Sequence, residues 1–255
     1  TAVSEPFGII NFQSGNPSRM TDLSWQHKEV TEAPYDITIM HINPDQVLQA
    51  IFELPSEYFD GHYTIGYWAW ELPEMPDDWV KCFKHFDEIW VPSRFVQQAV
   101  AMKSPVPVVC IPHAIDVTVD TSLTRKDFDL PEDVFLFLSM FDTYSMAERK
   151  NPYGAFRAFK QAFAADDQSV RLILKINNTT PKLMREIRAA IGEYSNIIPV
   201  EQVYSRREIN ALIANCDCYV SLHRSEGFGL GPAEAMSLGK ACIITNWSGN
   251  TDYMT

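Results

Sequence analysis

Residues 225–236 read S-E-G-F-G-L-G-P-A-E-A-M, a glycine-rich turn that leads into a predicted helix. The apolar run before the turn predicts a strand, and Pro232 suits a first helical turn, where a missing N–H is tolerated. Glycines let backbone approach a ligand closely, and free N–H groups at a helix N-terminus favour phosphate. Glu226 and Glu234 flank the turn, with seven residues between them.

Two interpretations of this turn are open. In the first, it binds a sugar joined to a diphosphate, so that Glu226 reaches sugar hydroxyls and Glu234 reaches a ribose. In the second, it is an ordinary strand-to-helix turn with solvated acids, because glycine turns before helices are common. In the first interpretation the turn itself supplies further donor-binding residues, namely Gly227, Phe228, Gly229 and Leu230.

The stretch resembles the glutamate, seven residues, glutamate signature of retaining glycosyltransferases of the "group 1" family, which have two Rossmann-like domains (GT-B). Residues 216–255 resemble the donor half of that family nearly throughout. Three further stretches resemble its bacterial polysaccharide, mannosyltransferase-like branch: G-Y-W-A-W-E-L-P from Gly66, E-I-W-V-P-S-R-F from Glu88 and E-R-K-N-P from Glu148. Several motifs in the right order are more specific than one.

The resemblance implies an α/β protein that transfers a hexose, with retention, from a UDP- or GDP-linked sugar. The implied acceptor is a glycan or a lipid-linked glycan. Two other classes stay open: a non-catalytic nucleotide-sugar-binding scaffold, and an epimerase or phosphorylase that uses the same double Rossmann fold, since fold alone does not fix the reaction.

A second constellation is formed by Arg149 and Lys150, just ahead of Pro152, which marks a helix start. In the family, a lysine that corresponds to Lys150 helps neutralise the diphosphate leaving group. An arginine after the first donor-domain strand normally shares that task, but Met140-Phe141-Asp142 occupies its neighbourhood here. Either Arg149 replaces it or Lys150 acts more nearly alone; the plain alternative is a solvated helix cap.

Other candidates follow predicted strands. His41 ends an apolar strand, and an acceptor-domain histidine at a comparable place contacts the sugar in relatives; a structural histidine is the alternative. Lys175 closes the strand R-L-I-L-K-I-N and points toward the ligand crevice, or else is exposed on the surface. Val203 and Tyr204 resemble the loop whose backbone receives the nucleotide base.

Five residues near these motifs have weaker assignments. Trp68, Trp70 and Glu71 could line an acceptor groove, although aromatic side chains after a strand more often belong to the core. His223 and Arg224 precede Glu226 directly and either assist the sugar or shape the turn.

The chain alternates apolar runs with amphipathic stretches, which indicates parallel sheets covered by helices. A break in this pattern places the domain boundary near Val117, with an acceptor-side domain at 1–117 and a donor domain at 118–255. Compared with the family, both domains look incomplete, so a GT-B fold truncated at both ends is expected. The strands are predicted at 36–42, 63–68, 88–92, 106–111, 134–140, 170–176, 197–200, 217–222 and 241–245.

Composition limits the remaining possibilities. The 255 residues are 46% hydrophobic and carry a formal net charge of −12, which argues against nucleic acid or anionic lipid as a partner. The sequence lacks a run of eighteen apolar residues and a signal-peptide pattern, and its five cysteines lack metal spacing, so a cytoplasmic protein without a transmembrane segment is expected. The D-x-D triplet at 127–129 does not follow a strand, so we expect neither metal nor cofactor.

Overall fold

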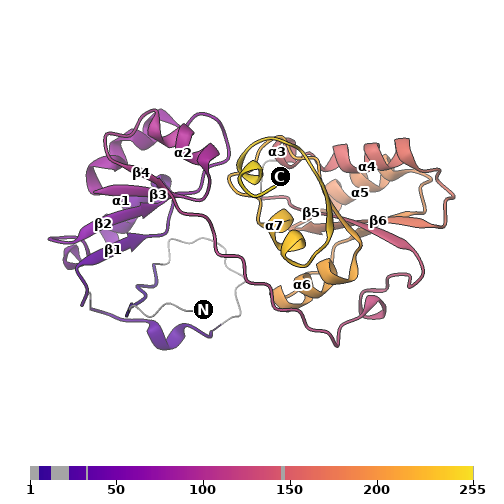
Figure 1. Ribbon diagram of the computed structural model, residues 1–255, viewed down its shortest axis with the longest axis horizontal. Helices are drawn as coiled ribbons and strands as arrows, with labels where there is room; N and C mark the ends of the chain where they lie inside the picture. Colours follow the sequence, from indigo (N-terminus) through magenta and orange to yellow (C-terminus); the bar gives the residue numbers. More distant parts are fainter. Residues whose placement is uncertain (1–5, 13–22, 33, 145–146, 255) are drawn as a thin grey trace. The chain divides into compact units, whose positions relative to one another are not determined.

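The computed structural model describes residues 6–12, 23–32, 34–144 and 147–254. The chain divides into two compact units, Thr1–Pro112 and His113–Thr255 (Figure 1). The predicted boundary near Val117 lies in the irregular segment that follows the last strand of the first unit. Among the described residues, no helix has the length and apolar character needed to cross a membrane.

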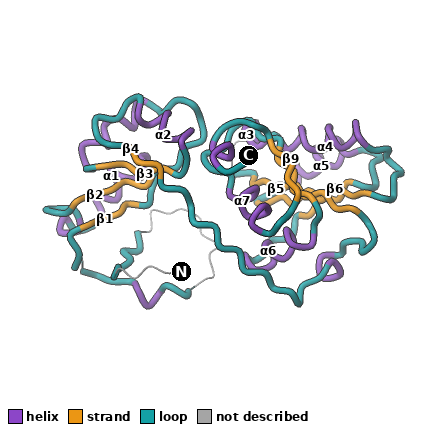
Figure 2. The backbone as a smooth tube through the Cα atoms, viewed as in Figure 1, coloured by secondary structure: helices purple, strands orange, loops and turns teal. Residues whose placement is uncertain are grey.

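The first unit contains a parallel sheet in the order β1-β2-β3-β4 (Figure 2). Its strands are β1 (Ile37–Met40), β2 (Tyr63–Tyr67), β3 (Glu88–Val91) and β4 (Val108–Cys110). Its helices are α1 (Pro44–Glu53) and α2 (Arg94–Ala101), together with the 3₁₀ segments Gln26–Lys28, Ser56–Tyr58 and Asp77–His85. Pro44 occupies the first turn of α1, and the Ser93 hydroxyl caps α2 by accepting from the Val96 N–H.

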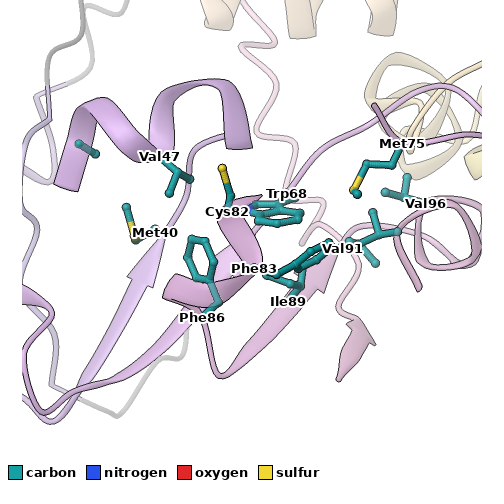
Figure 3. Close-up of a cluster of buried hydrophobic side chains, with 12 residues drawn as sticks. Met40, Val47, Trp68, Met75, Cys82, Phe83, Phe86, Ile89, Val91 and Val96 are labelled. Carbon is teal, nitrogen blue, oxygen red and sulfur yellow. The ribbon is translucent and has the colours of Figure 1, made fainter. Parts of the chain in front are cut away.

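Trp68 lies at the centre of the core of this unit (Figure 3). Its side chain is fully buried, and its ring packs 5.0 Å from Phe83 and 5.5 Å from Phe86, measured between centroids. Burial of such a side chain contributes about 1.5–3 kcal/mol. The hypothesis that Trp68 lines an acceptor groove is therefore wrong. Trp70 packs on Trp79 at the edge of the same core, with centroids 4.7 Å apart.

The second unit contains a parallel sheet in the order β7-β6-β5-β8-β9. Its strands are β5 (Phe135–Asp142), β6 (Val170–Asn177), β7 (Ile197–Val200), β8 (Cys218–Ser221) and β9 (Ala241–Ile244). Its helices are α3 (Ala147–Lys150), α4 (Pro152–Ala162), α5 (Pro181–Ile191), α6 (Arg206–Asn215) and α7 (Leu230–Ser237), with 3₁₀ segments at Arg125–Phe128 and Gly249–Asp252. Every predicted strand range overlaps one of the observed strands; β5 and β6 extend two residues and one residue beyond their predicted ends.

Both faces of the second sheet are covered, which explains why its central strands are continuous apolar runs. Leu138 and Ile173 pack with Leu212 of α6 on one face, whereas Leu174 packs with Phe159 of α4 on the other. Figure 1 shows α4 and α5 above this sheet and α6 below it. The alternation of side chains along β5 and β6 thus creates two cores, one on each side.

The strand order of this sheet reverses between β5 and β8. The chain runs outward from β5 through β6 to β7 and then returns to β8 on the opposite side of β5. In open parallel sheets, ligands bind beyond the carboxyl ends of the two strands at such a reversal. The segments that leave these two strands lead to α3 and to α7, which carry the motifs found in the sequence.

Candidate functional site

Two cations and one carboxylate meet where the strand order reverses. Arg149 Nη1 donates to Glu226 Oε2 at 3.0 Å, and Lys150 Nζ donates to Glu226 Oε1 at 2.7 Å. The side chains of Arg149 and Glu226 are 8% and 11% exposed, and that of Lys150 is 24% exposed. Arg149 Nη1 also donates to the Ser225 carbonyl at 2.9 Å. The structure thus brings together three residues that the sequence placed in separate motifs.

Backbone geometry joins the two segments that carry this cluster. Asn151 adopts a left-handed conformation between α3 and α4, with φ of 46°, and its Nδ2 donates to the Leu222 carbonyl at 2.7 Å. The Arg224 N–H donates to the Arg149 carbonyl, and the Arg224 guanidinium donates to the Glu148 carbonyl. Arg149 and Lys150 are therefore fixed beside Glu226 by contacts that do not involve their own charges. Lys150 ends α3 and lies two residues before α4, close to the predicted helix start.

The glycine-rich turn between β8 and α7 is closely packed. Gly229 precedes α7 with φ of +88°, a conformation that side chains disfavour, and an added Cβ would lie 2.8 Å from the Tyr253 hydroxyl. That hydroxyl donates to the Gly229 carbonyl at 2.6 Å. Phe228 is buried edge-on to His113 and against Tyr253, while Leu230 is half exposed. The turn is thus held in one conformation before α7 begins.

Glu234 lies inside α7 and is buried, with 6% of its side chain exposed. Its carboxylate accepts a charge-assisted hydrogen bond from Arg206 at the start of α6. Burial, followed by the charges of Glu226 and Glu234, raises the pKa of Tyr219. Both carboxylates of the signature are thus buried and paired with a cation.

Lys175 is nearly fully buried, so the alternative of surface exposure is wrong. β6 continues two residues beyond Lys175, and Nζ donates to Asn177 Oδ1 at 2.6 Å. The ammonium also lies 5.5 Å from the Tyr204 ring centroid, a cation–π contact. Burial, with smaller contributions from Glu208 and Asp129, raises the pKa of Tyr204. Neighbouring Val203 is 59% exposed.

The family model for glycosyl transferases group 1 matches residues 123–255, which is more than half of the chain. The chain belongs to this family. No curated protein sequence matches the chain.

The fold is similar to that of several solved glycosyltransferases. They include the pneumococcal O-GlcNAc transferase GtfA in complex with UDP and GlcNAc (TM-score 0.60, 16% identity) and Anabaena HepE in complex with UDP and glucose (TM-score 0.65, 15% identity). A UDP-forming trehalose-phosphate synthase from Burkholderia vietnamiensis is also similar (TM-score 0.57, 15% identity). These matches cover 86%, 87% and 75% of this chain and 44%, 62% and 54% of those chains. They establish the GT-B fold of this group 1 family member.

His41 belongs to the first unit of this family member and directly follows β1. Its ring packs edge-on against Tyr67, with centroids 4.6 Å apart, and partial burial lowers its pKa. It borders a cavity of about 450 Å³ that is also lined by Asp45 and Gln46 of α1. The cavity lies at the carboxyl ends of β1 and β2, the edge where parallel sheets of this family's fold gather ligands.

The D-x-D triplet of this group 1 protein has a structural role at its first residue. The Asp127 carboxylate accepts from the Thr124 N–H at 2.7 Å and thereby closes a capping box at a 3₁₀ segment. Within the described ranges, no group of three or more histidine, cysteine, aspartate or glutamate side chains is arranged to hold a metal ion.

Three residues at the donor side of this family member were missed by the sequence analysis. Arg206, Ser248 and Asn250 lie far from the glutamates in sequence, and nothing in their local pattern shows which carboxylate or loop they contact. The capping box S-R-R-E at 205–208 locates the start of α6 but not its neighbour α7. His223, given two possible roles above, is 1% exposed and bonds Ser221 and Asn250, so the structure places it within the turn.

Proposed function

We propose that this protein is a retaining glycosyltransferase that moves a hexose from a UDP- or GDP-linked sugar to a glycan or lipid-linked glycan. The observation that carries the proposal is the meeting of Arg149, Lys150 and Glu226 where the strand order of the second unit reverses. Cations at this position can neutralise the charge of a diphosphate leaving group, and the carboxylate can accept hydrogen bonds from the hydroxyls of a sugar.

Lys150 is assigned to the departing diphosphate. An ammonium has three donors, of which one bonds Glu226, and its side chain is partly open to solvent, so N–H groups remain for phosphate oxygens. As the bond from the anomeric carbon to the phosphate oxygen breaks, negative charge grows on the β-phosphate. A fixed cation and the N-terminus of α7 stabilise that charge more in the transition state than in the ground state. These groups supply what a divalent ion supplies in other transferases.

Glu226 is assigned to the sugar hydroxyls. Each of its oxygens accepts from a cation, which holds the carboxylate in place and lowers its nucleophilicity. The acceptor hydroxyl therefore attacks the anomeric carbon from the face that the phosphate leaves. The new bond joins the acceptor oxygen to that carbon, and the acceptor proton passes to the leaving phosphate oxygen, so retention requires no covalent enzyme intermediate.

The remaining residues are assigned by their place. Glu234 binds the ribose once the bond from Arg206 is exchanged for ribose hydroxyls, and Val203 and Tyr204 border the base. The acceptor is assigned to the cavity beside His41, whose lowered pKa keeps the ring neutral at neutral pH and able to accept a hydrogen bond from a sugar hydroxyl.

Calorimetric titration with UDP, GDP, UDP-glucose and GDP-mannose, with and without EDTA, tests the proposal. We expect nucleotide-sugar binding that survives EDTA, and transfer of sugar to a glycan acceptor extract. Binding without transfer or hydrolysis supports the scaffold instead, and interconversion of sugars supports an epimerase. Absence of binding to all four ligands would refute the proposed function.

A further inference from the structure

The loop that follows β9 is hydrogen-bonded to the backbone of Glu226, and this pair of bonds is called the grip below. Ser248 Oγ accepts from the Glu226 N–H at 2.8 Å, and the Gly249 N–H donates to the Glu226 carbonyl at 2.9 Å. Both polar backbone groups of Glu226 are thus bonded to two consecutive residues of a neighbouring loop. The carboxylate points away from this grip, toward Arg149 and Lys150.

These hydrogen bonds require an unusually close approach of two segments of the backbone. A Cβ on Gly249 would lie 2.0 Å from the Gly227 carbonyl oxygen, so no other residue fits there without moving backbone. Ser248 itself has φ of 77° and ψ of −154°, a region almost restricted to glycine. Such strain persists only where the surroundings determine the conformation, and it gathers at functional sites. A serine kept in a glycine conformation points to a need for its hydroxyl.

A buried polar chain holds the gripping loop in place. Asn250 is 1% exposed; its Nδ2 donates to the Thr245 carbonyl at 2.9 Å, so its Oδ1 is left to accept from His223 Nε2 at 3.0 Å. His223 then carries its proton on Nε2, and its Nδ1 accepts from the Ser221 hydroxyl at 3.0 Å. The loop after β9 is therefore fastened to the end of β8, directly beside the turn that it grips.

We propose that Ser248, Gly249, Asn250 and His223 are positioning residues for Glu226, which set where its carboxylate meets the sugar of the donor. This inference rests on the proposed function and adds to it. None of the four residues needs to contact the substrate. Their role is to fix the backbone from which Glu226 extends, while Lys150 and the N-terminus of α7 hold the diphosphate independently.

Ser248→Gly is the decisive variant because it removes the hydroxyl and relieves the strained conformation together, so folding is preserved. One lost hydrogen bond corresponds to about a two- to tenfold change in an equilibrium. We expect the affinity for UDP or GDP to stay within about twofold of wild type. The ratio of the affinity for the matching nucleotide sugar to the affinity for the free nucleotide should fall about fivefold. Thr251→Ala is the matched control, because Thr251 Oγ1 bonds the Ser248 carbonyl in the same loop without touching Glu226.

Hydrogen exchange at the Glu226 amide gives a readout that needs no ligand. Ser248→Gly should speed exchange at this amide about fivefold or more, while Thr251→Ala leaves it unchanged. Unchanged exchange in Ser248→Gly, or equal loss of nucleotide and nucleotide-sugar affinity, overturns the positioning role. If the wild-type chain binds no nucleotide or nucleotide sugar, the proposed function fails, and the role in sugar recognition fails with it. Faster exchange would then support only the structural grip on Glu226.

Discussion

Arg149 and Lys150 are adjacent in sequence and bond the same carboxylate, yet their burial predicts opposite consequences of removing them. Replacing Arg149 by alanine takes away a buried charge and the donor to the Ser225 carbonyl. Breaking a buried ion pair costs about 3–5 kcal/mol. Glu226 keeps Lys150 as a partner, so we expect a loss of about 3 kcal/mol in the free energy of unfolding.

Lys150→Ala should behave in the reverse way. The Lys150 side chain is partly exposed, so its pair with Glu226 contributes at most about 1 kcal/mol to stability. If it neutralises the leaving group, its removal lowers sugar transfer by about a hundredfold or more. Lys182→Ala is a matched control, since Lys182 faces Glu186 at 4.0 Å on the exposed surface and should affect neither property.

Urea unfolding separates these effects because the tryptophans are unevenly distributed. Five of the six tryptophans lie before residue 113, and Trp247 alone lies in the second unit. Circular dichroism follows both units, whereas tryptophan fluorescence mainly follows the first. Arg149→Ala should lower the second unit's midpoint by about 1–3 M urea and leave the fluorescence transition in place. The reasoning is refuted if Lys150→Ala destabilises as strongly as Arg149→Ala, or if it leaves transfer unchanged.

Three further predictions concern single residues. Gly229→Ala should destabilise the second unit by about 1–3 kcal/mol in urea unfolding, because φ of +88° and the Tyr253 hydroxyl oppose a Cβ; an unchanged midpoint would contradict this. Burial and Lys84 lower the pKa of His85, so the unfolded chain binds a proton at this histidine more readily than the folded chain does. The urea concentration at the fluorescence-detected midpoint should therefore be lower at about pH 5.5 than at about pH 7.5, and His85→Gln should reduce this difference. Lys175→Met should keep or raise stability, because an apolar isostere avoids burying the ammonium, but should weaken UDP and GDP binding in calorimetry; unaltered affinity would exclude Lys175 from the donor site.

The strands were predictable because burial on both faces leaves a direct trace in the sequence. The run F-L-F-L-S-M-F of β5 has apolar residues on both faces, since α4 and α6 cover opposite sides of it. Lys175 is an exception, because it is a charged residue within an apolar strand. Its charge suggested a position in the ligand crevice or on the surface, but the side chain is buried, and Asn177 Oδ1 accepts a hydrogen bond from its ammonium.

Contacts between segments distant in sequence were not predictable. The pairing of Arg206 with Glu234 depends on α6 lying against α7, and the grip of Ser248 on Glu226 depends on β9 lying beside β8. Local patterns specify a helix start or a strand, but not which strand is its neighbour. The motifs thus located the glutamates, while their partners emerged only from the strand order.

The shared carboxylate explains how two adjacent cations are accommodated in the folded protein. Without an anion, Arg149 and Lys150 would repel each other in a partly buried setting, where charges are weakly screened. Glu226 supplies that anion, and in the proposed function a bound diphosphate adds further negative charge beside the same cations. In the proposed function, the carboxylate then accepts from sugar hydroxyls with the lone pairs that the cations do not use, and neither cation is left unpaired. Because the backbone of Glu226 is bonded to Ser248 and Gly249, the proposed function places its carboxylate in position before a donor binds.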